Sequence, residues 1–177
     1  MSHEITGQTQ GLKPSQLKSL ERTFRRRVPP SEIATQELLR HLLQVSDDIN
    51  RRVGVLIDRR GQVQDVVVGT AERIYLPDLG RARAGHGRLR GVRWIQTQFN
   101  RAALHKDDLT DLGKLRLDYS LTVASGSGGD LQIVAAHLVP DDAEGTLFDV
   151  VEANSIDGLA VGDFSRFISE LEIFVVA

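Results

Sequence analysis

The stretch that decides the fold is a strand-like run that leads, through a short loop, into a helix start. It reads Val92-Arg93-Trp94-Ile95-Gln96-Thr97-Gln98-Phe99, and then His105-Lys106-Asp107-Asp108-Leu109. The apolar first segment predicts a strand over 92–97 that ends in the Gln96-Thr97-Gln98 triplet. Acidic residues favour a helix N-terminus, so the second segment predicts a helix over 107–115.

Further strands are predicted on both sides of this run. Val53–Ile57 is a continuous apolar run, typical of a strand buried on both faces, and Asp58-Arg59-Arg60-Gly61 is typical of a hairpin turn. The partner strand is expected at 63–68 and a third strand at 73–76, followed by a long Gly/Arg loop over 77–91. Strands are also expected at 117–124 and 131–138, and a short edge strand at 146–151, before a last helix capped by Asp163.

Two helices are predicted ahead of these strands. Residues 1–12 have no periodicity and are expected to be a flexible lead-in. Pro14 is expected to begin the first helix and Pro29-Pro30 to end it, while Ser31 is a suitable N-cap for a second helix that reaches Ile49. The chain thus predicts a basic helical hairpin over 13–50 and an α+β domain over 51–177, with a mixed β-sheet flanked by helices.

Composition places the chain among ordinary globular proteins. Of its 177 residues, 41% are hydrophobic and 26% are charged, which is enough for one domain with a substantial core. It has no cysteine, which excludes disulfides and thiolate metal sites and fits a cytoplasmic location. The N-terminus has no apolar core typical of a signal peptide, and no apolar run is long enough to span a membrane.

The net charge of −2 conceals a strong asymmetry along the chain. Two segments are basic: the first, with one acid, contains Lys13, Lys18, Arg22, Arg25, Arg26 and Arg27, and the second, with none, contains Arg81, Arg83, Arg88, Arg90, Arg93 and Arg101. Beyond Asp141 acidic residues predominate. Such a distribution indicates either a surface that binds a polyanion or basic and acidic segments that pair with each other in the fold.

The run from Arg51 to Gly61, the following Val66-Val67-Val68-Gly69-Thr70 and the Gln96-Thr97-Gln98…Asp108 spacing resemble the RadC/JAB (MPN) metalloprotease-like fold. That family pairs a Glu with His-x-His and Ser-x-x-Asp. The resemblance puts the Glu position near Arg51, the His positions at Gln96 and Gln98, and the Ser position at His105, so only Asp108 is retained. A catalytic zinc site needs three protein ligands, and a neutral Gln amide replaces His poorly.

Other chemistry has little support in the sequence. We interpret Gln96 and Gln98 first as hydrogen-bonding residues at a strand end, and His105, His137 and Asp107-Asp108 as surface or helix-start residues. No Gly-x-Ser-x-Gly elbow or P-loop motif is present, so neither a serine hydrolase nor nucleoside triphosphate binding by a P-loop is predicted. The Gly/Arg loop with His86 favours contact with phosphates, or else is a solvated basic loop.

Two longer stretches resemble the N-terminal extension of some bacterial HflX-type GTPases. The first runs from Ile5 through Gly11-Leu12-Lys13-Pro14-Ser15-Gln16-Leu17 to Arg26-Arg27-Val28-Pro29-Pro30, and the second from Arg73-Ile74-Tyr75-Leu76-Pro77-Asp78-Leu79-Gly80 to Leu89-Arg90-Gly91. The resemblance covers nearly the whole chain and implies an N-terminal part of a larger protein. It also implies association with the large ribosomal subunit, and GTP and Mg²⁺ bound by a separate G domain whose motifs are absent from this chain.

Three functions follow as hypotheses. The first is a non-catalytic module without cofactor or metal that binds ribosomal RNA or a ribosomal partner through Lys18, Arg22, Arg25, Arg26, Arg81, Arg83, Arg88 and Arg90. The second is a RadC/JAB-type hydrolase or peptidase with an altered site at Arg51, Gln96, Gln98, His105 and Asp108. The third is a regulatory or dimerisation domain, which would form a homodimer or contact its own G domain.

Overall fold

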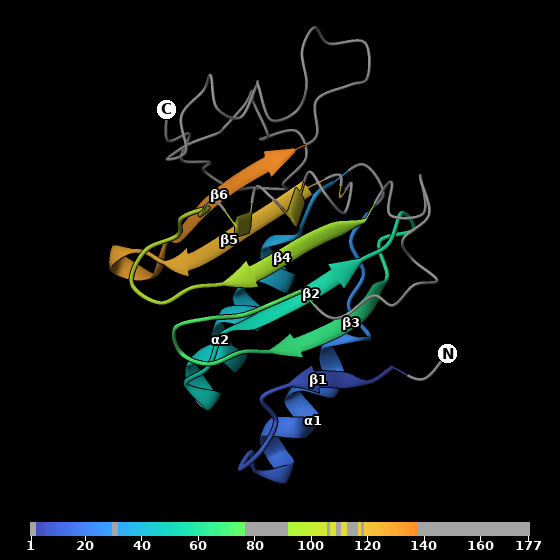
Figure 1. Ribbon diagram of the computed structural model, residues 1–177, viewed down its shortest axis with the longest axis vertical. Helices are drawn as coiled ribbons and strands as arrows, with labels where there is room; N and C mark the ends of the chain where they lie inside the picture. The colour runs from blue at the N-terminus through green and yellow to red at the C-terminus, as the bar shows by residue number, and fades with distance from the viewer. Residues whose placement is uncertain are drawn as a thin grey trace, which may run out of the picture.

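The fold is a six-stranded mixed sheet with two helices packed on one face (Figure 1). The computed structural model describes residues 3–29, 32–76, 92–105, 107–108, 111–112, 117 and 119–137. The strands are β1 Ile5–Gly7, β2 Val53–Ile57, β3 Val63–Val68, β4 Arg93–Thr97, β5 Tyr119–Ser125 and β6 Leu131–His137, and the helices are α1 Pro14–Thr23 and α2 Gln36–Ile49. The predicted α+β class is confirmed.

The sheet has the strand order β1-β3-β2-β4-β5-β6. Strand β1 is parallel to β3, and β4 is parallel to β5, whereas the other neighbouring strands are antiparallel. Because β2 and β4 are antiparallel, with Gly54 opposite Gln96, the start of β2 lies beside the end of β4. The end of β3 lies at the same place, with Val68 opposite Val53.

The main core lies between the helices and one face of the sheet. Helix α2 buries an apolar face that includes Leu38, Leu39 and Leu42, as its spacing predicts. These side chains belong to one buried cluster with alternate residues of the central strands, such as Val55, Ile95, Leu121 and Ile133. The helices and the sheet therefore share a single core.

A second, smaller core lies on the opposite face of the sheet. It contains Leu56, Val67, Trp94, Ala102 and Leu112 among its buried residues. The Trp94 ring lies over Gly54 on the neighbouring strand, where a β-carbon would come within 2.2 Å of the ring. The glycine in the apolar run of β2 therefore makes room for the one tryptophan of the chain.

The prediction of a lead-in without regular structure is wrong for Ile5–Gly7, which form the edge strand β1. Three residues are too few for a periodic signal, and the strand is formed through its pairing with β3. Gly7 has a φ of +93°, and a β-carbon there would lie 2.1 Å from the Val68 carbonyl oxygen. The Gln8 amide donates to the same carbonyl.

Both predicted helix boundaries between 23 and 36 were wrong. Helix α1 ends at Thr23 rather than at Pro29-Pro30, because the chain turns and Arg27 forms a β-bridge with Gln62. Helix α2 begins at Gln36, with the Thr35 hydroxyl accepting a hydrogen bond from the Leu38 amide. Ser31 lies outside the described residues, five positions before the observed start.

The strand predicted at 73–76 was also wrong. The chain turns at Thr70, whose amide donates to the Arg73 carbonyl and whose side chain accepts from the Arg73 amide. Ile74 and Leu76 nevertheless pack on the second core while Tyr75 faces out, so the alternation is present without a partner strand.

The remaining predictions are partly confirmed or untested. Strands are confirmed at 119–125 and 131–137, joined by a short 3₁₀ turn at Ser127–Gly129. In the helix predicted at 107–115, the described residues Asp107, Asp108, Asp111 and Leu112 are helical. The loop at 77–91, the edge strand at 146–151 and the last helix after Asp163 lie outside the described residues.

Candidate functional site

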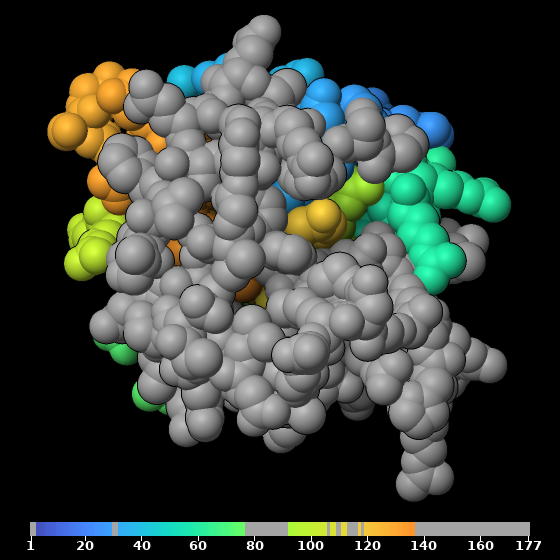
Figure 2. All heavy atoms as spheres, turned by 90° about the horizontal axis from the view of Figure 1, so that it is seen from above, coloured from blue at the N-terminus to red at the C-terminus, as the bar shows by residue number. Residues whose placement is uncertain are grey.

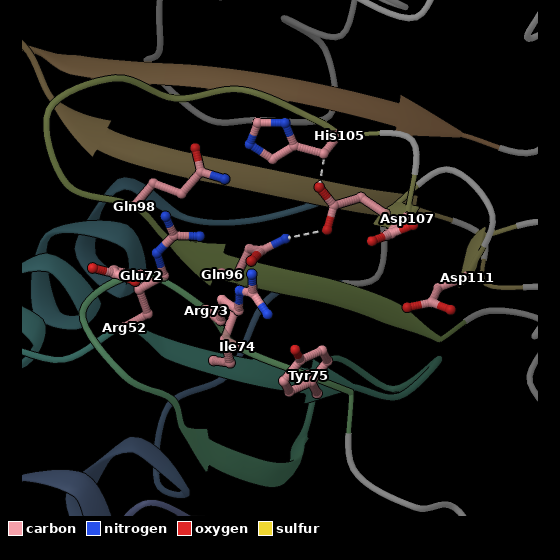
Figure 3. Close-up of a pocket in the computed structure, with 11 residues that line it drawn as sticks. Arg52, Glu72, Arg73, Ile74, Tyr75, Gln96, Gln98, His105, Asp107 and Asp111 are labelled. Carbon is pink, nitrogen blue, oxygen red and sulfur yellow. Dashed lines mark hydrogen bonds between the residues drawn. The ribbon is translucent and has the colours of Figure 1, made fainter.

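A polar pocket of about 350 Å³ lies where β2 begins and where β3 and β4 end (Figure 3). Four segments supply its walls: the residue before β2, the turn after β3, the end of β4 and the helical turn after it. The lining residues are Arg52, Glu72, Arg73, Ile74, Tyr75, Gln96, Gln98, His105, Asp107, Asp108 and Asp111. Four of the five predicted metal-site positions therefore meet in one pocket.

A buried chain of hydroxyl groups fixes the segments that form this pocket. The Val53 amide donates to Thr97 Oγ1, and the Thr97 hydroxyl donates to Ser46 Oγ. The Ser46 hydroxyl in turn donates to the Arg51 carbonyl at 2.6 Å. Three elements are held together in this way: the end of α2, the start of β2 and the end of β4. The middle residue of the Gln-Thr-Gln triplet thus has a structural role.

Gln96 and His105 both hydrogen-bond to Asp108. Gln96 is 2% exposed, and its Nε2 donates to Asp108 Oδ1 at 2.8 Å. The His105 backbone amide donates to Asp108 Oδ2, also at 2.8 Å. A carboxylate that accepts from the amide three residues before it is half of a helix capping box. Both oxygens of Asp108 are therefore already engaged, and the polar-x-x-Asp spacing is explained by helix capping.

The Gln98 side chain closes the loop that follows β4. Its Nε2 donates to the Ala103 carbonyl at 3.0 Å, and its Oε1 accepts from the Ala103 amide at 2.9 Å. The Gln98 backbone amide donates to the Val123 carbonyl on β5. The interpretation of both glutamines as hydrogen-bonding residues at a strand end is confirmed.

Arg51, the fifth of the predicted metal-site positions, is not among the residues that line the pocket. Arg51 points away from the pocket and donates to the carbonyls of Gln8 and Gln10, which fixes the loop between β1 and α1. Arg52 lines the pocket instead, and its Nε donates to the Ala71 carbonyl at 3.3 Å. Burial lowers the pKa of Arg52, although the charges of Asp108 and Glu72 oppose this effect. An arginine stays protonated in either case.

A second candidate site is a basic surface that joins α1 to the β2–β3 turn. Its members are the exposed residues Lys18, Arg22, Arg25, Arg27 and Arg60. The Val28 amide donates to the Gly61 carbonyl at 2.8 Å, and Arg27 forms a bridge with Gln62. These two contacts bring Arg25 and Arg27 next to the turn, which projects beside the blue N-terminal part of the chain (Figure 2).

The basic surface includes one acid, the exposed Glu21 of α1, which lies three residues after Lys18 and four before Arg25. None of its five cations forms an ion pair within the described part of the chain. Asp58, the acid of the turn, accepts from the amides of Arg60 and Gln62 and from the Gln64 side chain. Arg26, a predicted member, is instead half-buried and paired with Glu37. Arg26 is thus the one member of this segment with an ion pair among the described residues, and the acidic stretch beyond Asp141 lies outside them.

Several residues of the two sites were missed in the sequence. Arg60 was assigned only to a turn, Arg73 and Tyr75 only to a strand, and Arg52 only to the run that resembles the RadC/JAB fold. The place of Arg52 in the pocket could have been predicted, because the side chains of successive residues in an extended chain point to opposite sides, so Arg51 and Arg52 cannot both face the pocket. Arg81, Arg83, Arg88 and Arg90 lie outside the described residues.

Comparisons with protein-family models, curated proteins and solved structures found no match. Among the described residues, no cluster of three or more His, Asp or Glu side chains is arranged to hold a metal ion. No helix in the described ranges is long and apolar enough to cross a membrane.

Proposed function

We propose that this chain is a non-catalytic RNA-binding module, the N-terminal domain of an HflX-type GTPase that contacts ribosomal RNA of the large subunit. The observation that carries the proposal is the basic surface of Lys18, Arg22, Arg25, Arg27 and Arg60, which has no ion-pair partners among the described residues. GTP and Mg²⁺ would belong to the G domain of such a protein, and that domain would be a second partner.

Phosphate contact is the chemistry that this surface fits best. A guanidinium group forms two parallel hydrogen bonds with phosphate oxygens, and four of the five cations are arginines. Lys18 and Arg22 lie four residues apart on α1, Arg25 lies in the turn just after the helix, and Arg27 and Arg60 extend the charge further. A row of cations from two segments can follow a nucleic-acid backbone, which a single exposed side chain cannot.

The pocket chemistry supports a non-catalytic assignment. Gln96, Gln98 and the Asp108 carboxylate use their polar atoms to fix the strand end and the helix start. The Arg52 guanidinium lines the same pocket, and a cation there would disfavour both a metal ion and a general base.

Charge reversal on the basic surface tests the proposal. The variant Arg27→Glu/Arg60→Glu should lose at least tenfold in affinity for a labelled fragment of large-subunit rRNA at low salt. The matched control is Arg40→Glu/Arg101→Glu, which changes the net charge equally at two exposed arginines elsewhere. An equal decrease in affinity in both variants would mean that only the net charge matters and not the position of the arginines. Unchanged RNA binding in both variants would overturn the proposed surface.

The predicted loop can be tested in the same assay. We expect Arg81→Glu/Arg83→Glu to weaken RNA binding by a similar factor, because guanidinium groups interleaved with small residues suit phosphate contact. Wild-type affinity in this variant would remove the loop from the proposed interface and leave the α1 surface in place.

A second candidate is a metal-dependent hydrolase with an altered site. It is favoured by one observation, that Gln96, Gln98, His105 and Asp108 line the same pocket. Metal analysis of protein purified without chelators tests it. Stoichiometric zinc that disappears in Asp108→Ala would support this candidate, and a metal content that does not respond to the substitution would contradict it.

We propose further that the sheet has RadC/JAB-like architecture, since the Gln-Thr-Gln triplet ends β4 and the His-x-x-Asp segment begins a helix beside it. If so, Gln96→His/Gln98→His should create a zinc site with Asp108 as third ligand, measurable through the absorption of bound Co²⁺. Addition of Asp108→Asn should abolish the binding. A folded double variant that takes up no metal would contradict the architecture.

A further inference from the structure

The same pocket carries chemistry that neither helix capping nor the basic surface uses. We propose that it binds a guanine base, with Arg73 and Arg52 as hydrogen-bond donors, Asp107 as acceptor and Tyr75 as stacking platform. The source of the base, an unpaired guanosine of RNA, rests on the proposed function. The recognition of the base itself rests on the pocket alone.

The charges of the pocket favour a neutral ligand. Its lining carries two guanidinium groups, of Arg52 and Arg73, and four carboxylates, of Glu72, Asp107, Asp108 and Asp111, of which Asp111 has a further interaction of its own. A phosphate would meet this excess of negative charge, and an ammonium group would meet the two arginines. A neutral molecule that offers acceptors on one edge and donors on another matches both sets of groups.

The donors of the pocket are the two arginines. The Arg52 guanidinium uses only its Nε in a hydrogen bond to a described residue, which leaves its η nitrogens available. The exposed Arg73 side chain has no hydrogen-bond or ion-pair partner among the described residues. Figure 3 shows Arg52 and Arg73 with Gln96 on one side of the pocket. Guanidinium donors of this kind pair with the O6 and N7 acceptors of guanine.

The acceptor is the Asp107 carboxylate. Asp107 is chosen over Asp108, whose oxygens each already accept one hydrogen bond, from Gln96 and from the His105 amide. Asp107 is exposed and has no described partner, and Figure 3 shows it across the pocket from Arg52 and Arg73. A carboxylate can accept from both N1–H and the N2 amino group of guanine, two adjacent donors.

Tyr75 provides the aromatic surface. Its side chain is 70% exposed and is the one large hydrophobic residue exposed to this extent in the described ranges. Its neighbours Ile74 and Leu76 pack on the second core, which fixes the backbone that carries the ring at the pocket edge. Exposed aromatic rings stack on unpaired bases in sequence-specific RNA recognition.

Guanine fits this arrangement better than the other bases. Adenine places an amino donor where guanine has O6, so it would direct a donor at the arginines. Cytosine and uracil lack the second edge that N7 provides. The pocket volume of about 350 Å³ lies at the lower end of the range for small-molecule sites and is adequate for a nucleoside.

Free nucleosides test this inference without any phosphate. We expect guanosine to bind the full chain, as measured by calorimetry or chemical-shift titration. The analogue 7-deazaguanosine lacks N7 and inosine lacks the 2-amino group, so each should bind about tenfold more weakly. Adenosine should bind at least as weakly as these analogues. Equal affinity for all four nucleosides, or no binding of guanosine, would overturn the inference.

Variants assign the binding to the pocket. Asp107→Asn and Arg73→Gln should each weaken guanosine binding about tenfold, and Tyr75→Ala should do so more than Tyr75→Phe, which keeps the ring. Asp47→Asn, an exposed acid on α2, is the matched control and should leave the affinity unchanged. Wild-type affinity in Asp107→Asn, Arg73→Gln and Tyr75→Ala would contradict the assignment.

The outcome is separable from that of the proposed function. Arg27→Glu/Arg60→Glu should bind guanosine like the wild type, because the basic surface contacts phosphates only. RNA binding without guanosine binding would overturn the pocket inference and leave the RNA-binding proposal intact. Guanosine binding without RNA binding would overturn the RNA-binding proposal and leave the pocket inference intact.

Discussion

Thr97 determines the geometry of the pocket at the scale of single residues. Its buried hydroxyl accepts from the Val53 amide and donates to Ser46 Oγ. Thr97→Val keeps the shape but leaves the buried Val53 amide without an acceptor. We expect a decrease of about 1–3 kcal/mol in the free energy of unfolding, measured with urea.

Thr122 is the matched control for this substitution. It is also fully buried, on the neighbouring strand β5, but its hydroxyl has no hydrogen-bond partner among the described residues. Thr122→Val should therefore be neutral or stabilising. Equal destabilisation by the two substitutions would contradict the role assigned to Thr97.

His41 gives the protein a predictable response to acid. Its Nε2 lies 2.9 Å from Thr23 Oγ1, and its pKa is lowered by burial and by the charges of Arg26 and Arg22, against a smaller opposing effect of Glu37. The unfolded chain therefore takes up a proton on His41 at a higher pH than the folded protein does. Stability should fall as the pH decreases through about 6.5, the unfolded pKa. In His41→Gln the fall in unfolding free energy that is due to His41 should disappear. If stability decreased with pH by as much as in the wild type, the role assigned to His41 would be contradicted.

The residues of the pocket were predictable only where they are close in sequence. Gln96, Gln98, His105 and Asp108 belong to one strand–loop–helix segment, and the structure brings them together. Arg51 and Arg52 were not distinguished, because the choice between them depends on which side of the chain faces the sheet end. Arg73 and Tyr75 reach the pocket through the turn at Thr70, whose side-chain hydrogen bonds a strand pattern does not reveal.

At the scale of elements, the β2–β3 turn positions the basic surface. Gly61 has a φ of +78°, and a β-carbon there would lie 1.6 Å from the Val28 carbonyl oxygen. Gly61→Ala should therefore push the 27–28 segment off the turn as well as strain the backbone. We expect a decrease of about 3 kcal/mol or more in unfolding free energy, together with weaker RNA binding.

Gly128 is a control that separates the two effects of Gly61→Ala, the clash with Val28 and the backbone strain. It has a similar φ of +76°, but no atom lies within 4 Å of a β-carbon built there. Gly128→Ala should cost only the backbone strain, about 1–2 kcal/mol, and should leave RNA binding unchanged. If the two alanine variants were destabilised equally, the contact between Gly61 and Val28 would not hold the turn in place.

Elements with strong local signals were predicted, and those formed by distant contacts were not. The apolar runs of β2 and β4 and the apolar face of α2 are confirmed within a few residues. Strand β1 has three residues and depends on pairing with β3, whose partner residues lie 61 positions further along the chain. At 73–76 the alternating pattern correctly indicates which side chains face the core. It does not indicate whether another strand lies alongside to pair with, so the strand prediction failed there.

At the scale of the whole molecule, the sheet order joins segments that the sequence separates. The pairing of β2 with both β3 and β4 brings Arg52, the turn after β3 and the Gln-Thr-Gln triplet to one sheet end. The bridge between Arg27 and Gln62 brings the basic segment that follows α1 to a turn more than thirty residues away. The strand order and these contacts come from long-range packing, which no local pattern predicts.

The basic surface is therefore a property of the fold and not of one segment. Sequence charge alone indicates two basic stretches, while the structure places Arg60, from neither stretch, beside the first of them. An RNA strand that follows this surface would contact α1 and the β2–β3 turn together, and each phosphate bound in this way would release counterions.

The salt dependence of RNA binding tests the central claim most directly. We expect the logarithm of the affinity for single-stranded RNA to fall linearly with the logarithm of salt concentration. In Arg27→Glu/Arg60→Glu the slope should be shallower by about 0.7 for each phosphate that the variant no longer neutralises. The same slope as in the wild type, or binding that salt does not weaken, would contradict a phosphate-binding surface formed by α1 and the β2–β3 turn.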